Sequence, residues 1–265
     1  MKSTLSLPKE VLTILAEVSQ IAQYLWEKDW AERNAGNISI DLSDFFQKEI
    51  VSNPEHIIAF PLPPQSANLT LFVSGKGCHL RYLADKPETV SCILKINSDA
   101  SGFRILWGGE RGDFMPTSEL ITHIKIHLYN ATNRPSHKAV LHTHPLELIV
   151  LSHHLLFQDE EKFNHSLWKM CPEIKLFVPE GIFCAPYALS GSESLANITI
   201  QGLEKRNIIL WEKHGALSSS ETLTSAFDFL DVANKAAKML LLAWSAGFEP
   251  SGLSEDELRE LENLI

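Results

Sequence analysis

The sequence has little positive charge and few cysteines, and both shortages exclude classes of protein. Its 265 residues hold 23 Lys and Arg against 33 Asp and Glu, a formal net charge of −10. General nucleic-acid-binding proteins carry a basic surface, so no nucleic-acid partner is expected, although a local basic pocket for a small anion is compatible with this balance. The four cysteines form no C-x-x-C pair, which indicates reduced thiols in a cytoplasmic protein.

Long hydrophobic runs are also missing. The apolar run 239–244 is far shorter than the roughly 20 residues of a membrane helix, so no membrane partner is expected. The N-terminal stretch has no apolar core followed by a cleavage site, so no signal peptide is predicted. What is present, 45% hydrophobic and 21% charged residues, is typical of a globular protein. No linker or repeat divides the chain, so we predict one α/β domain over residues 1–265.

The hydrophobic spacing predicts helices and strands that intermingle without strict βαβ alternation. Apolar residues recur at helical spacing over residues 8–30, 117–131, 221–244 and 254–264, and a further helix is predicted near 145–157. Alternating or short continuous apolar runs predict strands at 38–42, 69–74, 90–99, 101–109, 139–144, 174–180 and 207–220. Residues 51–70, rich in Pro, Asn and Ser, are predicted to form a surface loop.

Two histidines stand two residues apart in the apolar run AVLHTHPLELIV, residues 139–150. On a strand, residues i and i+2 point to one face, so His142 and His144 project side by side. Burying a polar ring without a partner costs on the order of a few kcal/mol, so either backbone groups or a shared metal ion must satisfy the rings. His214, at a strand end before Gly215, is the strongest third candidate. Three protein ligands with one open position are typical of catalytic zinc.

Other titratable residues lie on the helix predicted over 117–131. His123 and His127 have an i, i+4 spacing that can also bind metal, but the glutamate of H-E-x-x-H is absent. We expect both to be partly exposed helix residues. Zinc chemistry also needs a group that moves protons, and Glu119, in PTSEL, is the candidate. The alternative is an ordinary glutamate that caps the helix or complements its dipole.

The motifs WAERNAGNISIDL, FVSGKG, PTSE, LHTHP, LFVPEGI and LWEKHGAL occur in an order that resembles the class II aldolase/adducin family. The resemblance extends from the N-terminal helix to the helix ending near Trp244. It implies a mixed, largely antiparallel sheet flanked by helices, one Zn²⁺ per chain and a cyclic homotetramer. The phrase ERNAGN and the long interval between HTH and HG favour the members that act on L-rhamnulose 1-phosphate. The implied reaction is its reversible cleavage to dihydroxyacetone phosphate and L-lactaldehyde.

The resemblance also implies a role for each motif. The zinc ligands correspond to His142, His144 and His214, the three residues that the spacing itself suggests. Glu119 corresponds to the catalytic acid/base. Glu173, in KMCPEIKLF, corresponds to a second catalytic glutamate that reaches the active site across a subunit contact.

The implied phosphate site combines a turn with a helix start: Asn34, Gly36, Asn37, Thr117 and Ser118. Gly and Asn permit a turn that exposes backbone N–H groups, and a helix N-terminus attracts phosphate. Lys76, in Ser74-Gly75-Lys76-Gly77, stands where the family usually has a phosphate-binding serine. A lysine can bind phosphate as a point charge, so we include Lys76 in the substrate site.

The resemblance leaves alternatives open, because a fold does not determine a function. The same scaffold hosts a pentulose-phosphate epimerase, a fuculose-phosphate aldolase and a sugar-phosphate dehydratase, which share the histidines. Adducin uses it as a non-catalytic interaction module. The intact set of three histidines and a glutamate argues against a non-catalytic module. Metal content would distinguish such a module from the enzymes of this scaffold.

Overall fold

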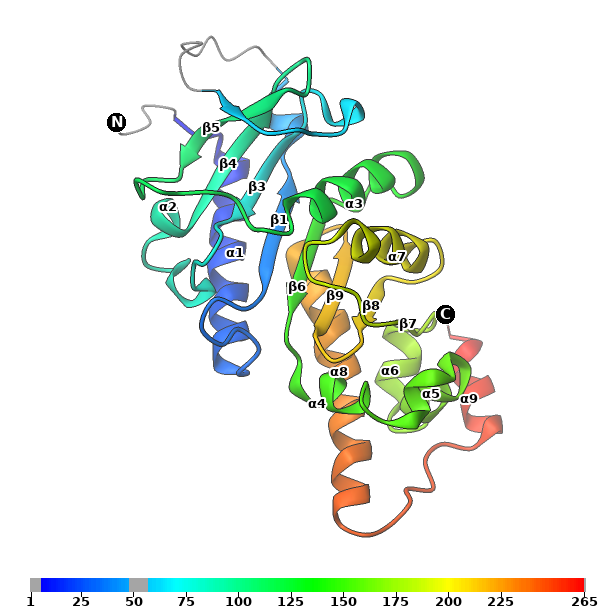
Figure 1. Ribbon diagram of the computed structural model, residues 1–265. Coiled ribbons are helices and arrows are strands. Elements are labelled where there is room, and N and C mark those ends of the chain that lie inside the picture. The colour runs from blue at the N-terminus through cyan, green and yellow to red at the C-terminus, as the bar shows by residue number, and fades with distance from the viewer. Residues whose placement is uncertain (1–5, 48–56, 265) are drawn as a thin grey trace.

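A single sheet runs through the computed structural model, which describes residues 6–47 and 57–264 (Figure 1). The strand order is β2-β5-β4-β3-β1-β6-β9-β8-β7. Neighbouring strands are antiparallel except β7 and β8, which are parallel. The predicted mixed, largely antiparallel sheet is therefore confirmed. The strands are β1 (Asn37–Asp41), β2 (Ile58–Ala59), β3 (Thr70–Ser74), β4 (Ser91–Ile96), β5 (Gly102–Gly108), β6 (Ala139–Thr143), β7 (Ile182–Ala185), β8 (Ile208–Trp211) and β9 (Gly215–Ser220).

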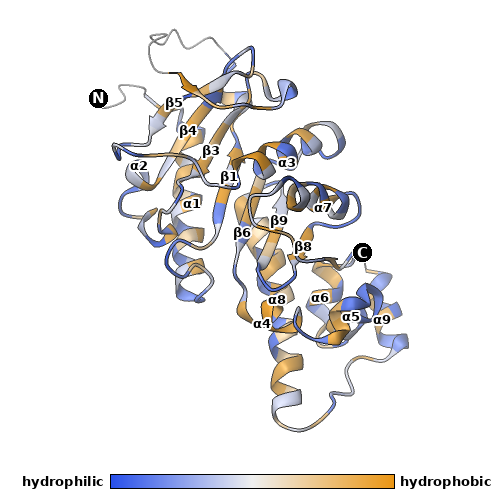
Figure 2. Cartoon of the chain, viewed as in Figure 1, coloured by the Kyte–Doolittle hydropathy of each residue, from blue (hydrophilic) through white to orange (hydrophobic). Residues whose placement is uncertain are grey.

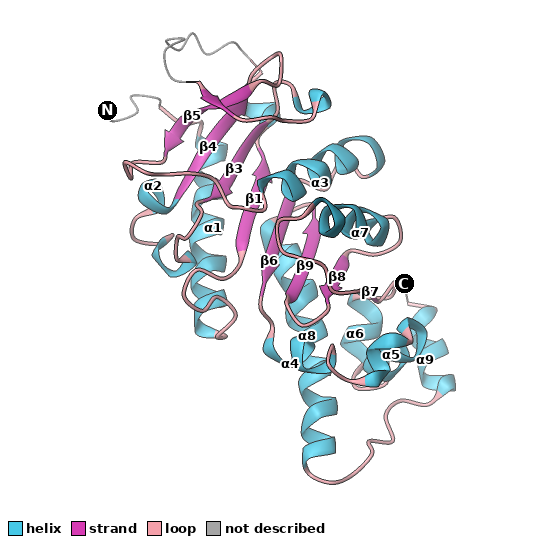
Figure 3. Ribbon diagram, in the orientation of Figure 1, coloured by secondary structure: helices cyan, strands magenta, loops and turns pink. Residues whose placement is uncertain are grey.

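Helices cover both faces of this sheet (Figure 3). Helices α1 and α8 contact each other behind the strands in this view, and α3 and α7 contact each other in front. Because both faces are covered, every residue of the central strands β3 and β6 is buried. The helices are α1 (Lys9–Glu27), α2 (Pro87–Val90), α3 (Leu120–Asn133), α4 (Leu146–Leu151), α5 (Glu160–Trp168), α6 (Pro172–Phe177), α7 (Glu193–Leu203), α8 (Leu223–Ser245) and α9 (Glu255–Glu262).

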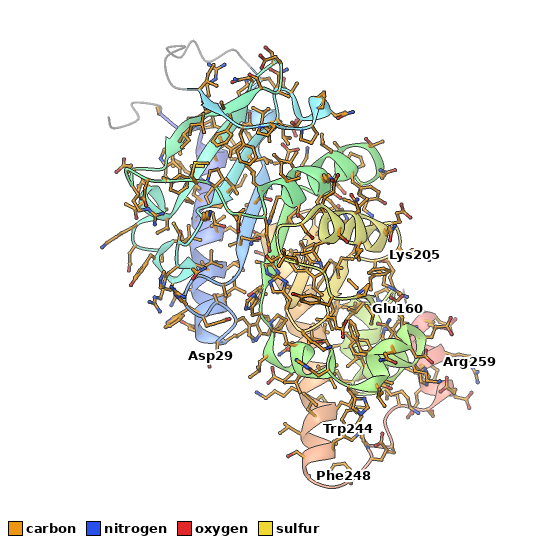
Figure 4. The ribbon with its side chains drawn as sticks, in the orientation of Figure 1. Asp29, Glu160, Lys205, Trp244, Phe248 and Arg259 are labelled. Carbon is orange, nitrogen blue, oxygen red and sulfur yellow. The ribbon has the colours of Figure 1, made fainter. Side chains whose placement is uncertain are left out.

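Hydrophobic residues concentrate in the strands and on the inner sides of the helices, whereas the loops are mostly hydrophilic (Figure 2). Polar contacts tie the smaller helices to this core. Glu160, labelled in Figure 4, lies at the start of α5. Its carboxylate accepts hydrogen bonds from the Cys184 backbone N–H at 2.8 Å and from Arg206 at 2.7 Å. Within the described residues, no helix is both long and apolar enough to cross a membrane.

The strand predicted over 174–180 is wrong. This stretch begins in helix α6, and the strand of the region, β7, follows it. A short apolar run fits a buried strand or a short helix equally well, and Pro172 at the first helical position favours the helix. The stretch 207–220 is a hairpin of β8 and β9, turning at Lys213 with φ +61°.

The remaining segments also differ in detail from the prediction. Residues 51–56 of the predicted loop lie outside the described residues, and the rest of it contains β2 and a 3₁₀ turn, Pro64–Ser66. The helix predicted near 145–157 is α4 followed by the 3₁₀ turn Leu155–Gln158.

Strand β1 lies at the centre of the sheet, and its two faces differ in chemistry. Ile38 and Ile40 are buried in the main hydrophobic core. The alternate residues Asn37 and Ser39 are buried too, but they form hydrogen bonds to side chains of α3. Asn37 is paired with His142 across β1 and β6, so this polar face leads directly to the histidine motif.

Candidate active site

Three histidines meet at one end of the sheet. His142 belongs to β6, His144 follows it, and His214 lies in the turn between β8 and β9. One ring nitrogen from each residue lies within 4.8 Å of the others, and the ring centroids are 4.9 to 5.5 Å apart. Gly215 allows this approach: a Cβ there would lie 2.8 Å from the rings of His142 and His144. The cluster can hold a metal ion.

Hydrogen bonds orient two of these rings. The Nδ1 atom of His142 lies 3.0 Å from the Ala216 carbonyl oxygen, and the Nδ1 atom of His144 lies 2.7 Å from a Glu32 carboxylate oxygen. Both partners accept, so each Nδ1 carries the proton and each Nε2 keeps a lone pair for a ligand. Glu32 is a site residue that the sequence analysis missed, although it lies in the quoted ERNAGN turn.

Burial keeps two of these rings, His142 and His214, neutral. It lowers the pKa of His142 to about 3 and also lowers the pKa of His214. The Trp211 ring contributes to the burial, because its centroid lies 4.5 Å from that of His142 and 5.2 Å from that of His214. Neutral imidazole is the form that binds a metal ion, so no proton has to be displaced from His142 or His214 near neutral pH.

Glu119 lies directly before α3, and its carboxylate faces the histidines rather than the helix. The side chain is 4% exposed and makes no capping hydrogen bond, which excludes a capping role. It accepts hydrogen bonds from Asn37 Nδ2 at 2.8 Å and from the Ser190 hydroxyl. Burial alone would raise the pKa of Glu119, but His142 and these two hydrogen bonds lower it to about 2. Ser190, in the loop before α7, carries no sequence signal and was missed.

The two loop segments predicted to bind phosphate lie beside each other. The Thr117 N–H donates to the Ser74 carbonyl at 2.9 Å, and the Lys76 N–H donates to the Met115 carbonyl at 2.8 Å. Lys76 and Ser118 are exposed, whereas Thr117 is buried. Thus the Ser118 hydroxyl reaches solvent directly beside Glu119 in the chain, and the cationic side chain of Lys76 reaches solvent two residues after the end of β3.

The turn before β1 lies against the strand that carries the histidines. Gly36 has φ +77°, and a Cβ there would lie 2.9 Å from the His142 carbonyl oxygen. Asn34 in the same turn is exposed. Asn37 differs from these neighbours, because it is 7% exposed and its amide is engaged by Glu119 and His123.

Glu173 is not brought to the cluster within one chain. It is exposed in the first turn of α6, a helix that packs against α5, α8 and α9. A hydrogen bond from its own backbone N–H lowers the pKa of the Glu173 carboxyl group, and a hydrogen bond with Cys171 adds a smaller effect in the same direction. A catalytic role for Glu173 therefore depends on a neighbouring subunit.

The expectation that His123 and His127 are partly exposed is wrong. They are 0% and 2% exposed and point from α3 onto β1. His123 hydrogen-bonds Asn37 Oδ1 through Nε2 and Ser39 Oγ through Nδ1 at 2.6 Å. The i, i+4 spacing shows that two residues share a helix face, but it does not show what covers that face.

The chain matches a known family over most of its length. Residues 16–241 match the family described as Class II Aldolase and Adducin N-terminal domain. The chain therefore belongs to the class II aldolase and adducin family.

Its relatives specify this class further. A protein of Bacteroides thetaiotaomicron named rhamnulose-1-phosphate aldolase is 34% identical, covering 98% of this chain and 97% of that one. One of Listeria welshimeri with the same name is 31% identical, covering 86% and 82%. The crystal structure of a sugar-phosphate aldolase from Thermotoga maritima superposes with a TM-score of 0.76 at 28% identity, covering 92% and 100%. The family match and these relatives together place the chain among the class II aldolases, which are carbon–carbon lyases.

Proposed function

We propose that this protein is a zinc-dependent aldolase that reversibly cleaves L-rhamnulose 1-phosphate to dihydroxyacetone phosphate and L-lactaldehyde. The observation that supports it most is the pairing of three clustered imidazoles with one buried, ionised carboxylate. Nitrogen ligands from three histidines suit zinc and leave a coordination position for substrate. A zinc ion held by His142, His144 and His214 would supply Lewis-acid polarisation of the ketone oxygen.

Glu119 moves the proton in this scheme. Its resting form is the carboxylate, which can take a proton from the reacting carbon of dihydroxyacetone phosphate in the synthetic direction. In the cleavage direction the Glu119 carboxylate first takes up a proton from solvent, which receives the proton of the departing hydroxyl in return, and then gives it to the same carbon after the carbon–carbon bond breaks. Asn37 and Ser190 hold the two carboxylate oxygens during these steps. Glu173 of a neighbouring subunit would take the proton of the departing hydroxyl.

The substrate phosphate is bound on the exposed side of the same region. Lys76 supplies a positive charge, and Thr117 and Ser118 supply hydroxyl or backbone donors at the start of α3. Asn34 and Gly36 would offer backbone N–H groups to the phosphate from the neighbouring turn. Together these groups hold the ketose so that its reacting carbons face the histidines.

The experiment that tests this function is a substrate comparison. Purified, zinc-loaded protein is given L-rhamnulose 1-phosphate, L-fuculose 1-phosphate or a pentulose phosphate, and dihydroxyacetone phosphate is measured with a coupled reductase. We expect the highest kcat/KM with L-rhamnulose 1-phosphate. Faster cleavage of the fuculose ester, or epimerisation of the pentulose, would assign one of the other sugar-phosphate activities. A protein without metal or turnover would fit an interaction module.

We further propose a cyclic homotetramer in the cytoplasm. Large apolar side chains are exposed on several elements, among them Leu155, Phe177 and Leu189 at 77%, 59% and 69%. The four unpaired cysteines suit a reducing compartment. The tetramer can be tested together with Glu173 by mixing subunits. Glu119→Gln and Glu173→Gln subunits, each inactive alone, regain part of the activity on mixing only if Glu173 acts across a subunit contact.

A further inference from the structure

A line of buried hydrogen bonds runs from Glu119 into the interior of the protein. Asn37 Nδ2 lies 2.8 Å from Glu119, and Asn37 Oδ1 contacts His123 Nε2. His123 Nδ1 lies 2.6 Å from Ser39 Oγ, and Ser39 Oγ lies 2.7 Å from His127 Nε2. All five side chains are less than a tenth exposed. We propose that His123 is a positioning residue, which holds the Asn37 amide in the one orientation that presents its NH₂ group to Glu119.

The direction of the first bonds follows from donor and acceptor chemistry. A carboxylate only accepts hydrogen bonds, so Asn37 must turn its NH₂ group toward Glu119. The carbonyl oxygen of the same amide then faces His123. Because that oxygen only accepts, the Nε2 atom of His123 must carry a proton. An Asn37 amide turned the other way would set its oxygen against the carboxylate.

The same reasoning continues to the end of the line. Burial keeps His123 neutral, lowering its pKa to about 4, so its Nδ1 atom has no proton and accepts from the Ser39 hydroxyl. Ser39 has then used its only proton, so its oxygen accepts from Nε2 of His127. That leaves the Nδ1 atom of His127 without a proton. This atom is buried and lacks a hydrogen-bond partner in the described structure.

Both ends of the line therefore favour one direction for its hydrogen bonds, the one in which Asn37 donates to Glu119. In the reversed arrangement, His127 would carry its proton on the buried Nδ1 atom, where no acceptor lies. A buried N–H group without an acceptor is rarer in proteins than a buried acceptor without a donor, and an amide oxygen facing a carboxylate is repelled by it. His123 can meet Asn37 only as a donor at Nε2, and this prevents the amide from flipping. Asn37 is also paired with His142 in the sheet, so the orientation sets Glu119 beside the histidine cluster.

The functional part of this inference rests on the proposed role of Glu119, and a matched pair of variants tests it. His123→Leu removes the donor to Asn37. Asn130→Leu removes a buried polar group of the same helix, 1% exposed, that hydrogen-bonds Ser219 at 2.9 Å and has no part in the line. His123→Gln keeps an N–H group that can reach Asn37 Oδ1.

For His123→Leu we expect kcat to fall roughly 10- to 100-fold with KM and zinc content unchanged, as for groups that orient a reacting residue. His123→Gln should recover most of that loss, and Asn130→Leu should keep the wild-type kcat. Equal kcat in the His123→Leu and Asn130→Leu variants would overturn the positioning role. Wild type inactive on every ketose phosphate would instead refute the proposed function.

A spectroscopic measurement tests the direction of these hydrogen bonds without an assay of enzyme activity. Solid-state NMR of protein labelled with ¹⁵N-histidine distinguishes protonated from bare ring nitrogens, and the His123→Gln variant assigns the His123 signals. We expect both His123 and His127 as neutral rings protonated at Nε2. A proton on Nδ1 of His123 would overturn the inferred direction, whatever the enzyme cleaves.

Discussion

Replacing Glu119 with glutamine removes the proton-transferring group while leaving its hydrogen bonds largely in place. The glutamine oxygen can still accept from Asn37 Nδ2, now 2.8 Å from the carboxylate. Its NH₂ group then faces Ser190, whose hydroxyl can rotate and accept instead of donating. The pocket keeps its shape, so the variant separates chemistry from folding.

The expected effects differ in size. Two hydrogen bonds to a charged group become neutral ones, a loss of about 1 kcal/mol each, which the lower burial cost of an uncharged side chain partly offsets. A general acid–base group contributes about 10²- to 10⁴-fold in rate, equivalent to roughly 2.7–5.4 kcal/mol. We therefore expect Glu119→Gln to lose most of its activity and at most about 2 kcal/mol of unfolding free energy.

The assay is exchange of solvent deuterium into dihydroxyacetone phosphate without any aldehyde, followed by proton NMR. Wild type should exchange and Glu119→Gln should not. Glu193→Gln is the control, because Glu193 also lies at the start of a helix but its side chain is 81% exposed. If Glu119→Gln exchanges at the wild-type rate, Glu119 is not the proton carrier and another base must act.

Three further predictions concern the metal, the phosphate and acid stability. His144→Ala should lose bound zinc and turnover while remaining folded, and full zinc content by elemental analysis would refute the ligand assignment. Lys76→Ala should raise KM for the phosphorylated ketose with little change in kcat, because it removes binding shared by ground and transition states; an unchanged KM would show that Lys76 only faces solvent. In metal-free protein, the folded-state pKa values of His123 and His127, about 4 and about 3, lie below the ordinary 6.5. The unfolded chain binds more protons below pH 6.5, so the free energy of unfolding should fall as pH drops from about 6.5 toward 4. Urea titrations that show no such fall in wild type, or the same fall in His123→Leu, would contradict this origin.

Much of the site follows from local patterns in the sequence. The two-residue period of a strand is enough to place His142 and His144 on one face, and the turn at Gly215 is enough to mark His214 as a strand-end residue. The mixed, largely antiparallel sheet was implied by the order of six motifs and is present in the structure. These features depend on residues close together in the chain or on a resemblance spread along it.

Tertiary structure decided which of these residues meet and which helix face is buried. The hydrogen bond between Glu119 and Ser190 joins residues 71 positions apart, and that between His144 and Glu32 joins residues 112 apart. No local period encodes such pairs, because they arise only when the loop before α7 and the turn before β1 close over the end of the sheet. His123 and His127 are buried for the same reason: the polar face of β1 lies against α3, and only packing creates that contact.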